Sequence, residues 1–494
     1  MNVPQPALRS ADSPGIFDIF TAHPNLQIVF IGLVAFTLIF TKLGGRGLAN
    51  YDDCFYAEKA KEILQTGEWM TMQYNHRPAF ENPPFYMWLT AASFTVFGVN
   101  DYGAKFPSAL MGTATILLVY FFARRLFDAW TGFAGSMVLS TTFIFIRYAR
   151  HAMFDVTLSF FVCLALLALI LALKKNSVYF LLWGTSIGIC VLTKSVLGFF
   201  PLVITVFFLL LTKRWRMLFS SYFIAGSFMA LSIGCSWYIH QYIKFGNNFL
   251  HVHFGWLIFQ RGFQAQSEPW YEHFSYAEDL LKYYLPWLPL LIIGVVKCVR
   301  MSLKKNESAL LLLLWVLVIF ITMSMMTTRV LWYIMPIFPA SAIIVANVLR
   351  GLLNERGAFV FQKVSYGMGL LAFIVLIGTP VQIEAEREKD VRTIAPLVNY
   401  FAGKGANVIA FRCDFYGLNN ALLFYSDHAA SPIYHSFDEV QTVMAKPETQ
   451  LCVVNASAID SLINIVQGIH IIRKTEELVL VSNKDLEPDI GATQ

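Results

Sequence analysis

"LANYDDCFYAEKAKEILQTGEW" (residues 48–69) begins just beyond the end of the first long apolar run of the chain, near residues 26–42. Two adjacent carboxylates, Asp52 and Asp53, therefore lie at the mouth of a predicted membrane segment. A solvated turn would explain them, and so would chemistry at a membrane surface. Which explanation applies depends on what the rest of the chain brings to the same side of the membrane.

The composition of the chain is that of a protein embedded in lipid. Of its 494 residues, 56% are hydrophobic and 14% are charged, whereas a soluble domain carries about 25% charged residues. Most of the chain must therefore have lipid as its solvent. The net charge of +5 is modest and is spread over the loops, which gives no reason to expect a nucleic-acid partner. The cysteines show no spacing that would hold a metal.

Apolar runs that approach the roughly 20 residues of a membrane span recur along the first 380 residues. Beyond Glu384, short β-rich runs such as "NVIAFR" (407–412) alternate with polar stretches of helical character. The sequence predicts a polytopic α-helical membrane protein with about 11 transmembrane helices in residues 1–380, followed by a soluble α/β domain in residues 381–494. The apolar runs lie near residues 26–42, 104–122, 131–147, 155–173, 178–193, 197–212, 218–238, 283–299, 308–327, 331–349 and 364–380.

Basic residues predict the sidedness of these spans. Every second loop carries a cluster of Lys and Arg, and such loops stay in the cytoplasm. The intervening loops and the C-terminal domain are then extracytoplasmic, as in a multi-pass protein of a cell inner membrane. The basic clusters are Arg124 and Arg125; Lys174 and Lys175; Lys213, Arg214 and Arg216; Lys297, Arg300, Lys304 and Lys305; and Arg350, Arg356 and Lys363.

The first external loop contains an ambiguous apolar run, residues 83–98. As a helix its 16 residues would reach about 24 Å, short of the roughly 30 Å hydrocarbon core. We therefore interpret it as an interfacial or partly inserted helix within a single external loop, residues 44–100. If the run crossed the membrane, Asp52 would move to the cytoplasmic face, away from the other candidates.

The stretch that begins at Asp52 is predicted to lie on the membrane as an amphipathic helix. Its apolar side is formed by Phe55, Ile63 and Leu64, and its water-facing side by Lys59, Lys61 and Glu62.

In this topology several ionisable residues fall on the outer side of the membrane. Taken singly, each has a structural explanation, because basic residues at helix ends often snorkel to the interface and Asp155 suits a helix N-cap. Taken together, they suit a reaction whose leaving group is a lipid phosphate: Arg and Lys bind the phosphate, and a carboxylate accepts a proton from an attacking hydroxyl. These residues are Asp52, Asp53 and Glu81 in the first loop, Asp155 at the start of the fourth span, Lys194 at the end of the fifth, Arg261 in "IFQRGF" and Arg329 after the ninth.

The segment "NYDDCFYAEKAKEILQTGEWMTMQYNHRPAFENPPFYMWLTAASFTVFGVNDYGAKFPSAL" (residues 50–110) closely resembles the first external loop of the GT-C polyprenyl-phosphate-sugar glycosyltransferases. That family shows an Asp-Glu-x-x-Tyr opening, a Gly-Asp/Glu-Trp, a Pro-Pro followed by Trp, and then Phe-Gly and Arg/Lys-x-Pro-Ser. The bacterial branch that includes the aminoarabinose transferase of lipid A is the most similar, and protein O-mannosyltransferases are more distant. The matching residues are Asp52, Asp53 and Tyr56; Gly67, Glu68 and Trp69; Pro83, Pro84 and Trp88; and Phe97, Gly98, Lys105, Pro107 and Ser108.

The resemblance implies a GT-C fold and an enzyme that moves a sugar from a polyprenyl-phosphate donor to a lipid, glycan or protein acceptor, with inversion. It also implies that Asp52 is the principal catalytic carboxylate and Asp155 a second acidic residue near the acceptor. It further implies that Lys194 and Arg261 bind the donor phosphate. The remaining candidates for substrate binding are Asp53, Tyr56, Glu81 and Arg329.

Three positions depart from the family pattern. Asn82 lies where close relatives have a lysine before Pro-Pro, so one phosphate-binding cation is missing. Asp53 replaces a glutamate, and Trp256 occupies a position where aminoarabinose transferases often have histidine. The donor site is therefore expected to be related to that of the aminoarabinose transferases but not identical.

Other classes of protein account less well for the pattern. A lipid or sugar transporter places ionisable groups near the bilayer midplane and often shows inverted repeats, whereas here the charges gather at one face and no repeat is visible. A membrane-anchored assembly protein would leave the spacing of the first loop unexplained. Within the enzyme class, protein O-mannosylation is the alternative. No cofactor is required, although a divalent cation is compatible with carboxylates beside a phosphate.

Overall fold

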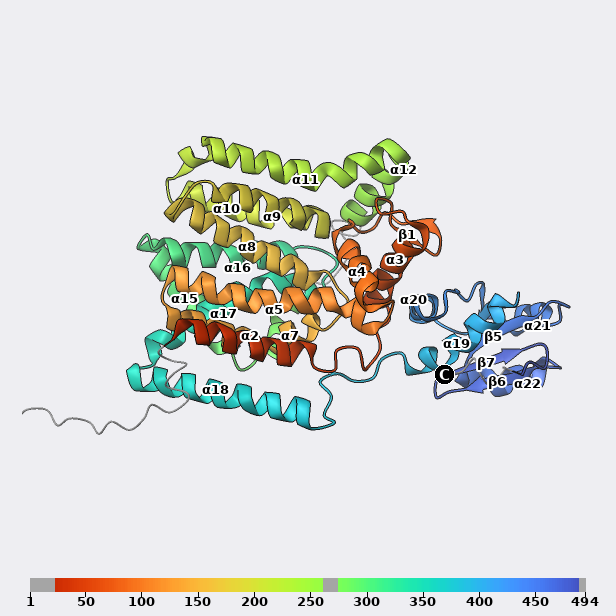
Figure 1. Ribbon diagram of the computed structural model, residues 1–494. Coiled ribbons are helices and arrows are strands. Elements are labelled where there is room, and N and C mark those ends of the chain that lie inside the picture. The colour runs from red at the N-terminus through yellow and green to blue at the C-terminus, as the bar shows by residue number, and fades with distance from the viewer. Residues whose placement is uncertain (1–22, 261–273, 488–494) are drawn as a thin grey trace, which may run out of the picture.

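Long apolar helices form a bundle that accounts for most of the protein (Figure 1). The computed structural model describes residues 23–260 and 274–487. In these ranges seven helical segments are long and apolar enough to cross a membrane, and a bent pair, α6 (Ala129–Ser140) and α7 (Phe143–Ala149), makes an eighth if it is one span. The protein is therefore a multi-pass membrane protein, as predicted. The seven segments are α5 (Asp101–Leu126), α8 (Asp155–Lys174), Tyr179–Leu211, α11 (Ser221–Phe245), α16 (Glu307–Ser324), Leu331–Leu352 and α18 (Glu355–Gly378).

The predicted number of about 11 spans is not confirmed. The predicted spans 178–193 and 197–212 correspond to α9 (Tyr179–Lys194) and α10 (Phe200–Leu211), two helices that a 3-10 turn, η1 (Ser195–Phe199), joins into one of the seven segments. Two others are shorter than the roughly 20 residues that a span usually needs: α2 (Pro24–Phe40) has 17 residues and α15 (Leu288–Leu303) has 16. The segment Leu331–Leu352 consists of η5 (Leu331–Ile337) and α17 (Phe338–Leu352).

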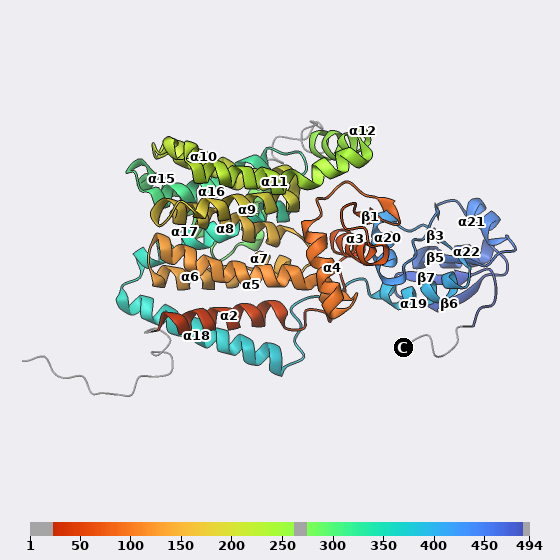
Figure 2. The same cartoon turned by 45° about the horizontal axis from the view of Figure 1, so that its top comes forward.

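The first loop folds into two short helices at one end of the bundle. α3 (Asp52–Thr66) and α4 (Phe85–Phe97) are joined through a small hairpin of β1 (Gln73–Tyr74) and β2 (Arg77–Pro78). The 13 residues of α4 reach only about 20 Å, which is too short for a span. Figures 1 and 2 show α3 between the end of the bundle and the C-terminal sheet.

The C-terminal region is a five-stranded sheet with flanking helices, so the predicted α/β character is confirmed. The strand order is β4-β3-β5-β7-β6; β3 pairs in parallel with β4 and β5, and β7 pairs antiparallel with β5 and β6. The central runs predicted as strands are apolar and buried, as expected of parallel strands covered on both faces. The strands are β3 (Asn407–Phe411), β4 (Ile433–Tyr434), β5 (Gln450–Asn455), β6 (His470–Lys474) and β7 (Leu478–Ser482), and the helices are α19 (Lys389–Gly403), α20 (Phe415–Ser426), α21 (Phe437–Met444) and α22 (Ile459–Ile465).

The prediction that α3 turns a charged face to water is wrong. Lys59, Lys61 and Glu62 are all buried. Lys61 donates to the carbonyls of Leu423 and Phe424 at the end of α20, each over 2.9 Å. Lys59 contacts Glu81 and Asn82, and Glu62 accepts from the N–H of His76, so the first loop itself covers the rest of this face. The sequence pattern of an interfacial helix does not reveal these contacts, and the partners of Lys61 lie more than 350 positions away.

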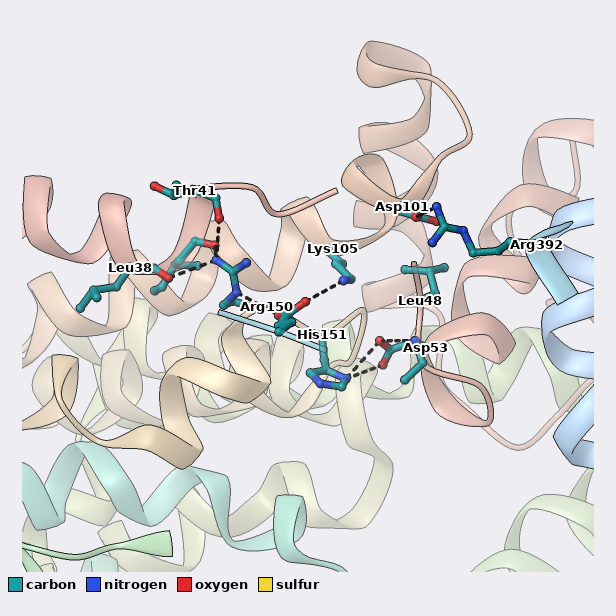
Figure 3. A network of polar contacts seen from close by, with 12 residues as sticks. Leu38, Thr41, Leu48, Asp53, Asp101, Lys105, Arg150, His151 and Arg392 are labelled. Carbon is teal, nitrogen blue, oxygen red and sulfur yellow. Dashed lines mark hydrogen bonds and ion pairs between the residues drawn. The ribbon is translucent and has the colours of Figure 1, made fainter. Parts of the chain in front are cut away.

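A buried arginine joins the bundle to the linker that leads into the C-terminal region (Figure 3). Arg150 is 1% exposed, and its Nη1 donates to the carbonyls of Leu38, Ile39 and Thr41. These carbonyls lie at the C-terminal end of α2, where a helix leaves its last carbonyls without internal partners. Arg150 Nε also donates to Glu384 over 2.9 Å, and Lys105 lies 3.1 Å from the same carboxylate. The carboxylate of Glu384 therefore joins the linker to Arg150 at the end of α7 and to Lys105 in α5.

We expect Arg150→Met to destabilise the protein by about 3 kcal/mol, because it removes one partner of a buried ion pair and the donor for the end of α2. Thermal unfolding of the protein in detergent measures the change. Arg356→Met is the matched control, since Arg356 is an exposed residue of α18. Equal unfolding temperatures for the two variants would contradict the expectation.

Candidate active site

The site is built around the first turn of α3. Asp52 and Asp53 occupy that turn, where the partial positive charge of the helix N-terminus favours carboxylates. The helix ends at Gly67, whose φ of 71° lies in the left-handed region that glycine adopts without strain. A glycine therefore sets the C-terminal end of the helix, and the first turn carries the two carboxylates.

Asp52 is partly buried and lies near charges of both signs. The hydroxyl of Tyr56, one turn along the helix, donates to its Oδ1 over 3.3 Å. Burial raises the pKa of Asp52 to about 6, and the charges of Asp155 and Asp53 add to this rise. The ammonium of Lys194 and the hydrogen bond from Tyr56 lower the pKa in part. Four of the predicted site residues therefore alter the pKa of Asp52.

Asp155 and Lys194 form a buried ion pair opposite Asp52. Asp155 begins α8 and Lys194 ends α9, so the antiparallel helices bring together two residues 39 positions apart in the sequence. They are 1% and 9% exposed. The pair occupies only one carboxylate oxygen: within the described ranges, Asp155 Oδ2 is buried and has no hydrogen-bond partner. A buried acceptor in this condition costs free energy unless another group pairs with it.

Two aromatic rings contact the ammonium of Lys194. Its Nζ lies 4.0 Å from the ring centroid of Tyr333 in η5 and 5.2 Å from that of Phe154. The Phe154 ring in turn packs on Tyr56, with centroids 4.8 Å apart. Cation–π contacts hold a positive charge without neutralising it. Tyr333 is not among the predicted site residues, because a tyrosine in an apolar run carries no charge pattern.

Asp53 has a different environment from its neighbour. His151 Nδ1 lies 3.1 Å from one of its carboxylate oxygens, and the N–H of Ala49 donates to the carboxylate over 3.3 Å (Figure 3). Burial alone would raise the pKa of Asp53, but His151 and the charge of Lys105 lower it below its usual range. The pKa values of the two adjacent carboxyl groups are therefore shifted in opposite directions, which is a common way of giving two acids separate roles. Asp53 is engaged with the protein rather than open to a substrate.

Glu81 belongs to a neighbouring polar patch. Its carboxylate lies 3.1 Å from Lys59 Nζ, which also donates to Asn82 Oδ1 over 3.1 Å. Lys59 is fully buried and lies 3.9 Å from the ring centroid of Phe55. A cation is therefore present beside Asn82, although it comes from α3.

The structure describes only one of the two arginines in the predicted set of site residues. Arg261 lies outside the described residues. Arg329 precedes η5, and its Nε donates to the carbonyl of Ser324 in α16 over 3.3 Å. It therefore lies near the short helix that supplies Tyr333.

Three carboxylates of the site already face nitrogen groups. Asp155 faces Lys194, Asp53 faces His151 and Glu81 faces Lys59. A metal ion would have to displace these nitrogen groups, and within residues 23–260 and 274–487 no group of three or more His, Cys, Asp or Glu could hold one.

Comparison with known proteins gives a matching family model and several curated relatives. A family model described as dolichyl-phosphate-mannose-protein mannosyltransferase matches residues 81–240. An uncharacterized protein from Aquifex aeolicus is 32% identical over 63% of this chain and 62% of its own length. The undecaprenyl phosphate-alpha-4-amino-4-deoxy-L-arabinose arabinosyl transferase 2 of Pseudomonas fluorescens is 28% identical over 72% of this chain and 65% of its own length. The chain thus spans less than two thirds of the length of these curated relatives.

Solved structures share the fold across nearly the whole chain. ArnT from Cupriavidus metallidurans, bound to undecaprenyl phosphate, aligns with a TM-score of 0.76 at 19% identity and covers 92% of this chain and 97% of its own. The Archaeoglobus fulgidus oligosaccharyltransferase, in complex with Zn and sulfate, aligns with a TM-score of 0.58 at 13% identity and covers 90% of this chain and 70% of its own.

Proposed function

We propose that the chain is a GT-C glycosyltransferase, as its similarity to such enzymes supports, and that it transfers a sugar from a polyprenyl phosphate to an acceptor at the outer face of the inner membrane. The observation that carries the proposal is the convergence of Asp52, Asp155 and Lys194 at one end of the bundle. The cation there can stabilise the negative charge of the leaving phosphate, and a carboxylate can accept the proton of the attacking group. The donor we propose is of the undecaprenyl type, as in the names of the arabinosyl transferases.

The proposed orientation follows from the two ends of α8 and α9. Asp155 and Lys194 lie at one end, and the basic pair Lys174 and Lys175 lies at the other end of the 20-residue helix α8. Such a helix is about 30 Å long, which is the thickness of the hydrocarbon core. If the basic turn is cytoplasmic, the candidate site and the C-terminal region are extracytoplasmic. Lipid-linked sugars need no nucleotide on that face.

The proposed reaction is an in-line displacement with inversion at the anomeric carbon. The acceptor oxygen forms the new bond, and the bond between the anomeric carbon and the phosphate oxygen breaks, with its electron pair leaving on the polyprenyl phosphate. Lys194, together with Arg261 and Arg329, stabilises the negative charge that develops on that phosphate. Asp52 accepts the proton of an alcohol acceptor. The unpaired oxygen of Asp155 accepts a hydrogen bond from a substrate hydroxyl.

The proposed base has a pKa suited to its work. A general base is most effective when its pKa lies near the working pH, and the pKa of Asp52 is about 6. Its carboxylate is largely ionised at pH 7 and still basic enough to take a proton. Asp53, whose pKa is lowered, stays ionised in the same range and serves to hold His151.

We expect kcat/KM with an alcohol acceptor to fall as the pH drops through about 6. Asp52 gains a proton in that range and can no longer accept one. The measurement is kcat/KM with purified protein between about pH 5 and 8. A profile that is flat over this range would contradict the assignment of Asp52 as the base.

The identity of the acceptor separates this proposal from two others. A sugar-labelled polyprenyl phosphate, beginning with 4-amino-4-deoxy-L-arabinose, is incubated with the purified protein and with lipid A, a glycan or a Ser/Thr-rich peptide. Label in the lipid fraction supports a lipid acceptor. Label in the peptide supports protein O-glycosylation, which the description of the matching family model favours. No transfer from any of several donors would overturn the enzyme proposal and favour a transporter.

A further inference from the structure

The residue before the proposed base has a strained backbone. Tyr51 has φ 60° and ψ −107°, a combination that is favourable for glycine and costly for a residue with a side chain. Such a conformation costs about 1–3 kcal/mol and persists only when its surroundings hold it. Since Tyr51 directly precedes Asp52, whatever holds this turn also fixes where the carboxylate of Asp52 lies.

Helix α20 of the C-terminal region supplies contacts on both sides of this turn. Asn420 Nδ2 donates to the carbonyl of Tyr51 over 3.2 Å. Asn50 Nδ2 donates to the carbonyl of Gly417, and the N–H of Leu48 donates to the hydroxyl of Tyr425 over 2.9 Å. Each contact joins residues more than 360 positions apart. The whole segment 48–51 is therefore held by one face of α20.

Asn420 is itself fixed in place. It is 5% exposed, and the hydroxyl of Tyr74 donates to its Oδ1 over 2.5 Å, so its amide group cannot rotate freely. Further along α3, Lys61 donates to the last carbonyls of α20 and lies 2.6 Å from Glu58 and 3.0 Å from Asp427. The two helices are thus joined at the start and in the middle of α3.

We propose that α20 positions the first turn of α3 for the transfer reaction, and that Asn420 is the main positioning residue because its amide holds the carbonyl of Tyr51. This inference rests on the proposed function, since it concerns the placement of Asp52. Asn420 touches neither Asp155 nor Lys194 in any contact described above. It acts through the backbone of Tyr51. The C-terminal region is then a working part of the enzyme.

The test uses Asn420→Asp and Asn420→Ala in the full-length protein. The aspartate keeps an oxygen for Tyr74 but loses the amide donor to Tyr51. Both variants are expected to lower kcat by about 10- to 100-fold, the scale seen when a reacting group is misplaced by an ångström. KM for the donor should change little, because the cations that bind the phosphate lie on other helices.

A second readout does not depend on catalysis. Cys54 is fully buried in the same turn of α3, and its labelling by a maleimide can be followed by peptide mass spectrometry. The Asn420 variants are expected to label Cys54 about tenfold faster, because the turn opens more often. Cys413 and Cys452, buried in the C-terminal region, report in the same sample that this region stays folded. If the wild type transfers no sugar, the proposed function fails, and Cys54 labelling still tests the hold on the turn.

Asn419→Ala is the matched control. Asn419 is a buried asparagine of the same helix, but its amide bonds the backbone of Ala430 within the C-terminal region. It is expected to keep the wild-type protection of Cys54 and a kcat within about twofold of wild type. Equal losses in the Asn419 and Asn420 variants would reduce the effect to the general stability of α20 and overturn the inference.

Relief of the backbone strain gives a rescue. Tyr51→Gly adopts the same backbone conformation without a steric cost, so adding it to Asn420→Ala should restore a large part of kcat. The inference is overturned if glycine restores nothing, or if the Asn420 variants keep both wild-type kcat and wild-type protection of Cys54.

Discussion

Asp52→Asn is expected to lower kcat with an alcohol acceptor by about 10²- to 10⁴-fold, the usual contribution of a general base. This corresponds to about 3–5 kcal/mol of transition-state stabilisation. Asparagine has nearly the same shape as aspartate and can still accept the hydrogen bond from Tyr56. The loss should therefore appear in kcat, while the dissociation constant for the donor stays close to that of the wild type.

The same variant distinguishes two roles of the carboxylate. A phosphate acceptor is already anionic near pH 7 and needs no base, so with such an acceptor the loss should be much smaller. Asp438→Asn is the control, since Asp438 is an exposed aspartate of α21 in the C-terminal region. An Asp52→Asn enzyme that retains most of its turnover with an alcohol acceptor would rule out the base.

Lys194→Met is expected to lower kcat by about 10²- to 10³-fold, because it removes a preorganised positive charge from the leaving phosphate. It also leaves Asp155 buried without its cation, which costs about 3–5 kcal/mol of stability. The double variant Asp155→Asn with Lys194→Met separates the two effects. Removing both charges should recover stability in thermal unfolding without recovering turnover.

Lys175→Met is the matched control for this experiment. Lys175 is an exposed lysine beyond the other end of α8, so its loss should leave both kcat and the unfolding temperature unchanged. If Lys194→Met keeps the turnover of the wild type, the cation does not stabilise the leaving group. If the double variant recovers turnover, the charge of Lys194 serves only to neutralise Asp155.

The fold was predictable wherever hydropathy alone decides it. Runs of apolar residues predicted the bundle, and the change of composition beyond Glu384 predicted the α/β region. Both predictions succeed because a helix in lipid needs a long apolar run, whereas a domain in water has short apolar runs between polar stretches. The number of spans was not predictable, since an apolar run does not show how long the helix within it is: α2 has 17 residues and α15 has 16. The exposure of α3 was wrongly predicted for another reason. A charged helix face looks the same in sequence whether water or a second polar surface covers it.

Of the site, the sequence predicted only some of the charged residues, and it did not predict which of them pair. The sidedness of the loops brought Asp52, Asp155 and Lys194 to one side, and the structure joins the last two as an ion pair. Pairing partners were not predictable, because they depend on helix packing at a scale of a few ångströms. His151 next to Asp53 and the ring of Tyr333 next to Lys194 carry no pattern of their own.

The order of synthesis gives the contact between α20 and the turn at Tyr51 a further consequence. A ribosome releases the helices of the bundle first and α20 more than 350 residues after the turn that it holds. A nascent chain therefore contains Asp52 and Lys194 well before α20 is available to hold the turn at Tyr51. We therefore expect a polypeptide cut short ahead of Asn420 to contain Asp52 and Lys194 but to lack the contacts that hold the backbone at Tyr51.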